Sequence, residues 1–313
     1  MTLLASRPDR AGGIRAMSAR LTALVDSARA SGRLDMLSRA IWLALIPGGL
    51  LFLAMQVYVY WQTDNIGLDS HAYWLAAREP ETWYTRPPAY HDAFLYSPAF
   101  GQVLRPLGVL PWPAFQAVWF LGCAAILAWL LAPLGWRRGL TLAPFFVSEL
   151  LLGNVYLLFA ASLVLSLGRL PGAVALPILT KVAPGVVGVW FVARGEWRKV
   201  FWVAGTTAAI VLVSVLTVPD AWVSWVQFLG TSAGDRGFGS TVRLVLAFVL
   251  VVWAARRNQA WLLAPALILA CPVLGGYGPL AVLAAIPRLL KWQRAHRAAT
   301  AEPAEVTTPH DLS

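Results

Sequence analysis

The run Ile41–Trp61 reads IWLALIPGGLLFLAMQVYVYW and contains no charged side chain. A helix that crosses a bilayer needs about 20 consecutive, mainly apolar residues, so this run is long enough to cross once. A polar segment, Gln62–Leu95, follows it directly. Its side chains that can exchange protons include Asp64, Asp69, His71 and Asp92. An apolar span followed by such a loop predicts a membrane protein whose reactive groups lie close to the bilayer.

The composition of the 313-residue chain indicates the same class. The chain is 58% hydrophobic and 13% charged, and its mean hydropathy is +0.64. A water-soluble core cannot hide that much apolar surface, so we predict an all-α, polytopic membrane protein. The net charge of +10 also occurs in nucleic-acid-binding proteins. Basic residues gather in the cytoplasmic loops of membrane proteins, however, and we expect no nucleic-acid partner.

Cysteine usage and missing motifs limit the possible chemistry. Cys123 and Cys271 both lie in apolar segments and indicate neither a disulfide framework nor a zinc site. No cluster of His, Asp and Glu has the spacing of metal ligands, so we expect no metal. The sequence also lacks a Gly-Lys-Ser/Thr phosphate loop and an Asp-x-Asp pair. These absences argue against ATP, against nucleotide-sugar chemistry and against a cofactor.

The first 40 residues precede the apolar region and carry seven arginines. A cleaved signal peptide would place its apolar core much nearer the start of the chain, so we expect none. Leu21, Leu24, Val25 and Ala28 have helical spacing among the arginines. This pattern fits either a helix lying on the anionic cytoplasmic leaflet or a disordered basic tail.

Apolar segments recur along the rest of the chain, and we expect ten helices in the membrane. They lie near 41–61, 112–134, 140–152, 154–168, 170–180, 183–194, 199–217, 241–255, 260–271 and 277–290. Several are shorter than a full span. The four segments between Gly139 and Arg194 are therefore expected to be half-helices or re-entrant pieces sheltered by protein, because lipid cannot satisfy a broken backbone.

The distribution of basic residues predicts the topology. With the N-terminus inside, the basic turns and the C-terminal tail fall on the cytoplasmic side. The first outer loop, the Gly153-Asn154 break, Lys181, the 218–240 loop and the Cys271–Gly278 turn then lie on the other side. We divide the chain into a cytoplasmic segment 1–40, a membrane domain 41–290 with its first outer loop at 62–98, and a cytoplasmic tail 291–313.

Asp69 is the strongest candidate for chemistry in the first outer loop. It lies a few residues beyond the first apolar run, and His71 and Tyr73 follow at positions i+2 and i+4. A helical turn here would stack Asp69 against Tyr73 at the membrane surface. A carboxylate held in this way can act as general base on a hydroxyl, an effect worth about 10² to 10⁴ in rate. His71 is either an acceptor- or phosphate-orienting group or a hydrogen-bonded surface residue.

Four stretches in a fixed order carry a resemblance to a known family. They are Asp69-Ser-His71-Ala-Tyr73; Tyr96-Ser-Pro98 followed by Leu107–Pro111 and Trp119; Gly153-Asn154; and Lys181-Val-Ala-Pro184 with the basic turn Arg194–Lys199. In these features the chain resembles the polyprenyl-phosphate-dependent membrane glycosyltransferases of the C-type fold. Within that group it is most similar to glycosyltransferase family 87, the alpha-mannosyltransferases of actinobacterial cell envelopes. The resemblance covers roughly residues 40–220.

The resemblance implies an inverting transfer on the outer side of the membrane. The donor would be a polyprenyl-phosphate sugar, typically mannose, and the acceptor a cell-envelope glycolipid or polysaccharide. Asp69 matches the catalytic base, and Lys181 would stabilise the phosphate leaving group, with Arg236 or Arg243 as helpers. The remaining residues that we expect to contact substrate are His71, Tyr73, Tyr96, Asn154 and Tyr277.

The sequence departs from the family pattern in its late outer turn, Cys271–Gly278, which lacks the tryptophan and histidine that many relatives carry there. That departure implies a different donor, a role for Tyr277, or lost activity. Glu149 is an intramembrane carboxylate without an assigned role. An arabinofuranosyltransferase is one alternative function, and a membrane carrier or scaffold without catalysis is another.

Overall fold

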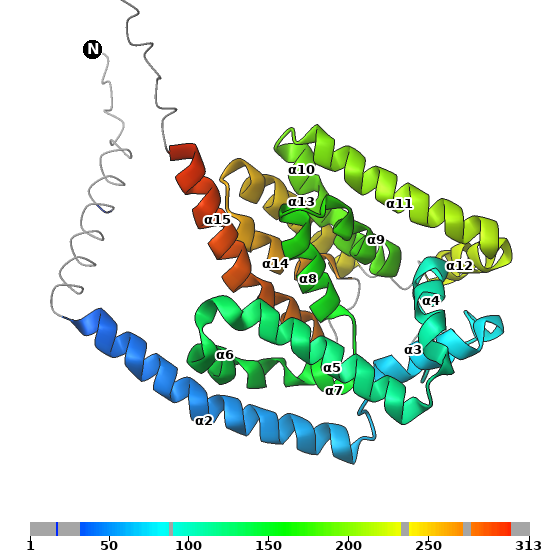
Figure 1. Ribbon diagram of the computed structural model, residues 1–313, viewed down its shortest axis with the longest axis horizontal. Helices are drawn as coiled ribbons and strands as arrows, with labels where there is room; N and C mark the ends of the chain where they lie inside the picture. The colour runs from blue at the N-terminus through cyan, green and yellow to red at the C-terminus, as the bar shows by residue number, and fades with distance from the viewer. Residues whose placement is uncertain (1–16, 18–31, 88–89, 233–237, 272–276, 302–313) are drawn as a thin grey trace, which may run out of the picture. The chain divides into compact units, whose positions relative to one another are not determined.

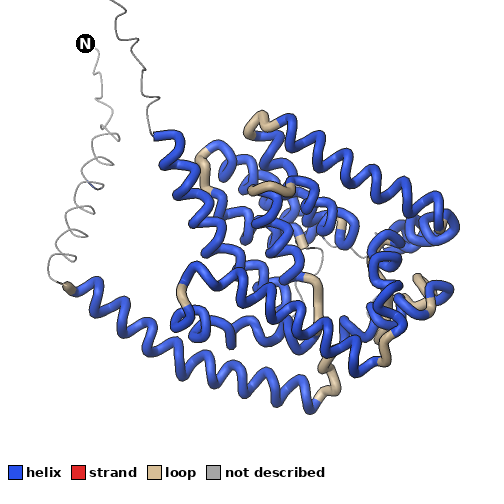
Figure 2. Tube along the Cα trace, in the orientation of Figure 1, coloured by secondary structure: helices blue, strands red, loops and turns tan. Residues whose placement is uncertain are grey.

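The computed structural model describes residues 17, 32–87, 90–232, 238–271 and 277–301, and all regular secondary structure within them is helical (Figures 1 and 2). The predicted all-α class is confirmed for these residues. The chain divides into two compact units, residues 1–51 and 52–313. The described part of the first unit is mainly the start of helix α2 (Arg33–Gln62). The helix or tail expected around Leu21–Ala28 lies outside the described residues.

Four helices are long and apolar enough to cross a membrane: Asp35–Gln62, Trp112–Leu134, Trp197–Thr217 and Phe238–Arg256. The pair Trp136–Leu152 and Tyr156–Leu167 is bent by 117° and counts as a fifth candidate if it forms one broken span. Among the ten transmembrane or half-spanning segments expected from the sequence, these four or five are the ones long and apolar enough to cross. The other expected segments are helical, but within the described ranges they are too short to cross alone.

The short helices of the second unit confirm that the region between Gly139 and Arg194 is broken into pieces. In chain order they are α6 (Trp136–Leu142), η4 (Ala143–Phe146), α7 (Val147–Leu152), α8 (Tyr156–Leu167), η5 (Pro171–Val174), α9 (Ala175–Lys181), η6 (Ala183–Gly188) and α10 (Val189–Ala193). Proline lies in the first turn of η4, η5 and η6. Proline fixes φ and cannot donate a backbone hydrogen bond, so it starts a helix more readily than it continues one.

Helix α8 provides much of the core of the second unit. Its side chains Leu157, Phe159 and Leu163 are almost completely buried. It packs against α5 (Trp112–Leu131), as Figure 1 shows, and also against η9 (Gly278–Ala285) and η5. Two further helices, α13 (Phe238–Arg256) and α14 (Leu263–Ala270), pack closely against each other. Most of the α8 residues are buried, but Leu165 is exposed, so protein covers most of this apolar helix and not its whole circumference.

Helix α11 (Trp197–Thr217) has the opposite character, because most of its apolar side chains face outward. Phe201, Leu212 and Leu216 are exposed. A soluble protein rarely exposes so continuous an apolar surface, whereas lipid would cover it. The exposure of this helix agrees with the membrane class inferred from composition.

The predicted first outer loop, residues 62–98, is folded rather than extended. It forms α3 (Leu68–Arg78) and η1 (Pro80–Thr82), and the chain continues into α4 (Pro98–Leu104) and η2 (Arg105–Val109). Aromatic side chains fill the space between these elements: Trp83, Phe94, Tyr96 and Phe100 are buried together. The helical turn expected at Asp69 is confirmed by α3.

The segment after α11, which belongs to the 218–240 loop of the predicted topology, forms α12 (Pro219–Ser232). Trp222 Nε1 donates to Ser214 Oγ at 3.0 Å, and the Phe228 ring lies 5.6 Å from the Tyr84 ring of the first outer loop. The rest of that expected segment includes residues 233–237, which lie outside the described part of the chain.

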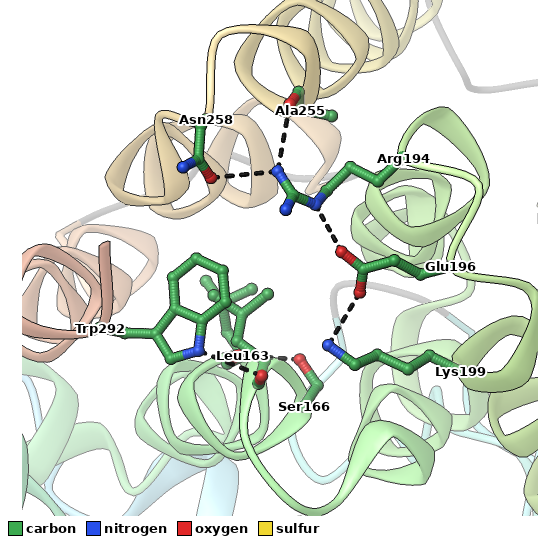
Figure 3. A network of polar contacts seen from close by, with 9 residues as sticks. Leu163, Ser166, Arg194, Glu196, Lys199, Ala255, Asn258 and Trp292 are labelled. Carbon is green, nitrogen blue, oxygen red and sulfur yellow. Dashed lines mark hydrogen bonds and ion pairs between the residues drawn. The ribbon is translucent and has the colours of Figure 1, made fainter. Parts of the chain in front are cut away.

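A network of charged side chains joins two turns of the second unit. Figure 3 shows the guanidinium of Arg194 between Glu196, at 2.5 Å, and Asn258 Oδ1, at 3.0 Å. Lys199 Nζ lies 2.8 Å from the second oxygen of Glu196. The turn between α10 and α11 is thereby tied to the turn that follows α13. The chain ends, in its described part, with α15 (Ile286–Ala301).

Candidate functional site

The break between α7 and α8 positions Asn154 beside Asp69. Gly153 ends α7 with φ of 71°, a conformation that glycine adopts at little cost. A Cβ on this residue would lie 2.4 Å from Ser70 Oγ, so only glycine lets α3 approach the break. The Asn154 amide donates to Asp69 Oδ2 at 2.5 Å and its oxygen accepts the Val155 N–H at 2.7 Å. The glycine thus permits the break, and the Asn154 side chain binds Asp69 and also satisfies a backbone N–H that the break leaves free.

The start of α3 fixes the position of Asp69. Gly67 caps the helix in the left-handed region, and its N–H donates to the Leu151 carbonyl at 2.6 Å. A Cβ on Gly67 would lie 3.0 Å from the indole of Trp112. Asp69 occupies the first turn, where the helix dipole favours a negative charge. The Asp69 carboxylate is therefore positioned by the start of α3, by the Asn154 amide and by the packing of Trp112 against Gly67.

Lys181 is the cation whose positive charge acts on the Asp69 carboxylate. Its ammonium donates to the Tyr156 hydroxyl at 2.9 Å and lies 4.1 Å from the centre of the Tyr156 ring. Its positive charge acts on both Asp69 and Glu149. The residue that follows, Val182, has φ of 55°, which β-branched residues rarely adopt. The charged residues of α3, α7 and α9 thus form one cluster, and Tyr156 at the start of α8 joins it through its hydrogen bond to Lys181.

The proton affinity of Asp69 differs from that of a free carboxyl. Burial raises the pKa of Asp69 above its ordinary value, because a charged carboxylate loses water. The positive charge of Lys181 and the hydrogen bond from Asn154 offset part of this rise in the pKa. A carboxylate of raised pKa is a stronger base, and Lys181 and Asn154 help to keep it ionised.

Glu149 is the most deeply buried carboxylate of the cluster, with 1% of its surface exposed. Oε1 accepts the backbone N–H groups of Tyr156 at 2.6 Å and Leu157 at 3.3 Å, so the side chain caps α8 across the break. Within the described ranges Oε2 has no hydrogen-bond partner, and a Cβ on Gly278 would lie 3.2 Å from it. The sequence marked Glu149 as unusual, and the structure adds this capping contact.

Tyr73 and Tyr96, which the sequence predicted to contact substrate, pack next to the cluster. The hydroxyls of Tyr73 and Tyr96 lie 2.8 Å apart, and both residues are buried. Lys181 Nζ lies 5.8 Å from the centre of the Tyr96 ring. Tyr84 donates to the Tyr96 carbonyl at 2.7 Å, which anchors the outer loop. In this arrangement Tyr73 packs and positions rather than facing an open surface.

His71 and Asp69 are neighbours in sequence but have different partners. Residues two apart on a helix diverge by about 200°, and the His71 ring contacts Asp92 instead, with 2.6 Å between Nδ1 and Oδ1. The sequence left His71 as either an acceptor- or phosphate-orienting group or a hydrogen-bonded surface residue. The described contacts of the two side chains are separate.

The remaining site residues lie toward the late turn. Tyr277 is 45% exposed, and its ring packs edge-on against the Phe52 ring, with 5.3 Å between the ring centres. It also interacts electrostatically with Tyr60, as Asp69 and Glu149 do. The positive charges of Arg243 and Lys181 both interact electrostatically with the Cys271 thiol. Arg236 and residues 272–276 of the late turn lie outside the described residues.

Tyr156 is the contact residue that the sequence did not reveal. Its hydroxyl accepts from Lys181 and its backbone N–H donates to Glu149. Its position two residues after Asn154, in a broken apolar segment that needs a polar partner for a buried lysine, is the signal that could have identified it. Among the described residues, no group of three His, Cys, Asp or Glu side chains is arranged to hold a metal ion.

These features define a polytopic helical membrane protein in which a helix break brings a carboxylate, an amide and an ammonium together. The family model of glycosyltransferase family 87 matches residues 94–307, and the chain belongs to this family of membrane glycosyltransferases. The match includes Tyr96, Asn154, Lys181, Arg243 and Tyr277, and it begins after Asp69. No curated protein and no solved structure matches the chain.

Proposed function

We propose that this glycosyltransferase takes a sugar from a polyprenyl-phosphate donor and transfers it, with inversion, to a glycolipid or polysaccharide acceptor on the extracytoplasmic side of the cell membrane. Mannose is the proposed sugar. The observation that supports this reaction best is the cluster itself. A buried carboxylate in the first turn of α3 accepts a hydrogen bond from the Asn154 amide and interacts electrostatically with the ammonium of Lys181.

Asp69 is the proposed general base. Its carboxylate accepts the proton of the acceptor hydroxyl while the hydroxyl oxygen forms a bond to the anomeric carbon. The bond between that carbon and the phosphate oxygen breaks, and its electron pair leaves with the polyprenyl phosphate. Base catalysis of this kind contributes about 10² to 10⁴ in rate. The contact from Asn154 holds the carboxylate in position for the transfer.

Lys181 is the proposed partner of the leaving phosphate. Negative charge grows on the phosphate as the glycosidic bond breaks, and a fixed cation stabilises that charge more in the transition state than in the ground state. The Tyr156 hydroxyl and ring hold the ammonium without neutralising it. Arg243 is a proposed helper, because its charge acts on the same thiol, Cys271, as Lys181 does.

The test is sugar transfer by the purified protein in detergent. Radiolabelled polyprenyl-phosphate mannose or arabinose is supplied with an envelope glycolipid extract to wild type, Asp69→Asn and Lys181→Met. We expect transfer from the mannose donor, a loss of at least about 10²-fold in Asp69→Asn, and normal folding of that variant. Transfer only from the arabinose donor would replace mannose with arabinofuranose. Equal transfer by wild type and Asp69→Asn would refute the proposed base, and a wild type inactive with both donors would favour a carrier or scaffold.

A further inference from the structure

A second polar cluster lies on another face of α3, and the proposed proton transfer does not use it. His71 Nδ1 lies 2.6 Å from Asp92 Oδ1, and Arg86 Nη1 lies 3.5 Å from Asp92 Oδ2. Asp69, by contrast, has Asn154 as its partner. The His71–Asp92–Arg86 cluster is therefore a neighbour of the base rather than a part of its hydrogen-bonded surroundings.

The cluster offers both donors and acceptors near its surface. When the His71 ring is neutral and its Nδ1–H donates to Asp92, the opposite nitrogen Nε2 is left as an acceptor. The side chains are 33% exposed for His71 and 43% exposed for Arg86, so they can be reached from outside. Sugar hydroxyls both donate and accept hydrogen bonds, and they match such a mixed set.

The charges of the cluster favour a neutral ligand over an anion. The Asp92 carboxylate lies between the histidine ring and the guanidinium and is 19% exposed. Its negative charge compensates that of Arg86. A phosphate group would meet the carboxylate as well as the cation, and two anions repel each other. A polyol meets no such penalty.

Two indoles flank the cluster. The His71 ring lies 4.7 Å from the Trp112 ring and 5.4 Å from the Trp74 ring, and the two indoles lie 5.8 Å apart. Trp74 Nε1 donates to the Leu110 carbonyl at 2.9 Å, which fixes its plane. Both indoles are partly exposed. Aromatic rings beside a few convergent polar groups are typical of small-molecule sites, and an indole face suits the C–H face of a sugar ring.

Trp112 connects this cluster to the base. Its indole packs against the position of Gly67, the residue that caps α3 two positions before Asp69. An acceptor chain that meets both Asp69 and the His71 cluster must therefore pass around the start of α3, where Trp112 lies beside Gly67.

We propose that His71, Asp92 and Arg86, with Trp74 and Trp112, form an acceptor subsite that binds a neutral sugar unit next to the one that is glycosylated. As part of a reaction, this inference rests on the proposed function. Carbohydrate binding itself does not require that function. Removing one hydrogen-bonding side chain from such a subsite weakens acceptor binding and leaves the base and the phosphate cation in place.

The binding test uses saturation-transfer difference NMR on the full chain in detergent, with mannose and arabinose oligosaccharides of two to four units as probes. We expect wild type to bind at least one probe, and His71→Ala and Arg86→Gln to bind it about tenfold more weakly, the loss of one good hydrogen bond each. His91→Ala is the matched control, because His91 is an exposed histidine of the same loop. Wild type that binds no probe, or variants that bind like wild type, would overturn the subsite.

The kinetic test separates binding from structure. We expect His71→Ala and Asp92→Asn to raise KM for the acceptor about tenfold while kcat is kept. If His71 and Asp92 only held the loop in place, the two substitutions would lower the unfolding midpoint and kcat and would have no specific effect on KM for the acceptor. That result would refute the proposal. Asp69→Asn should abolish transfer and keep oligosaccharide binding. The wild type could also bind an oligosaccharide without transferring any sugar. If the subsite variants then lose that binding, the subsite is supported and the proposed reaction is rejected.

Discussion

Replacing Gly153 by alanine tests whether the helix break holds the base. The left-handed conformation at this residue, with φ of 71°, costs an alanine roughly 1–2 kcal/mol. The new Cβ would also lie 2.4 Å from Ser70 Oγ and 2.6 Å from Ser70 Cβ. Overpacking of this kind costs about 1–3 kcal/mol, so we expect Gly153→Ala to lower the free energy of unfolding by about 2–5 kcal/mol in total.

Gly195→Ala provides the matched control. Gly195 has φ of 68° and no heavy atom within 4 Å of its added Cβ, so this variant should show the conformational cost alone. The assay is unfolding in mixed detergent micelles, followed by circular dichroism. In a double-mutant cycle, Ser70→Gly should reduce the penalty of Gly153→Ala to that of Gly195→Ala, because the overlapping side chain is then absent.

Sugar transfer should fall together with stability in Gly153→Ala. Relief of the overlap requires α3 to move away from the break, and this movement separates Asp69 from Asn154. A Gly153→Ala protein no less stable than Gly195→Ala would refute the inference that α3 presses on the break. An unchanged transfer rate would refute the inference that the break holds the base.

Three further predictions concern the charged groups. Asn154→Ala should move the acidic limb of the transfer-rate profile to higher pH, because removal of the hydrogen bond raises the pKa of Asp69 further and the base must be deprotonated; a limb that stays in place or moves to lower pH would contradict this. For Glu196, burial raises the pKa, but the bonds to Lys199 and Arg194 outweigh it and the net pKa is lowered. Its stabilisation is therefore present above the ordinary carboxyl pKa and lost as the pH falls through the lowered value. Glu196→Gln should lower the free energy of unfolding at pH 7 by about 1–3 kcal/mol, and the difference should shrink below about pH 4; equal differences at both pH values would count against the network. Glu149→Leu should be less stable than Glu149→Gln, because leucine leaves the N–H groups of Tyr156 and Leu157 without an acceptor, at about 1–3 kcal/mol each; unfolding midpoints that coincide would rule out the capping role.

The helix count shows where sequence reasoning fell short. Hydropathy located the long apolar helices and the broken region between Gly139 and Arg194, but not the less apolar helices α3, α4 and α12. It assigned a role in the membrane to ten segments, whereas four or five are long and apolar enough to cross. Apolar composition identifies burial but does not separate burial in lipid from burial in protein. Helix α8 is the example, because most of its residues are buried against other helices.

The candidate site was predictable in part. Asp69, Asn154 and Lys181 stood out individually, as a carboxylate beside a span, a polar residue in a glycine break and a lone basic residue. Their contacts were not predictable, because Asn154 meets Asp69 across 85 residues of chain and Lys181 meets Tyr156 across 25. The pairing of His71 with Asp92 rather than with the surroundings of Asp69 likewise depends on which face of α3 each side chain occupies.

The sequence by itself determined the membrane class, the all-helical structure, the broken central region and the resemblance to glycosyltransferase family 87. Each of these depends on local composition and on motifs short enough to read along the chain. The tertiary structure alone decided which polar groups meet and which of them stay separate. The physical reason is that a buried charge must find its partner wherever the packing of helices brings one, and that packing is set by contacts between segments far apart in the sequence.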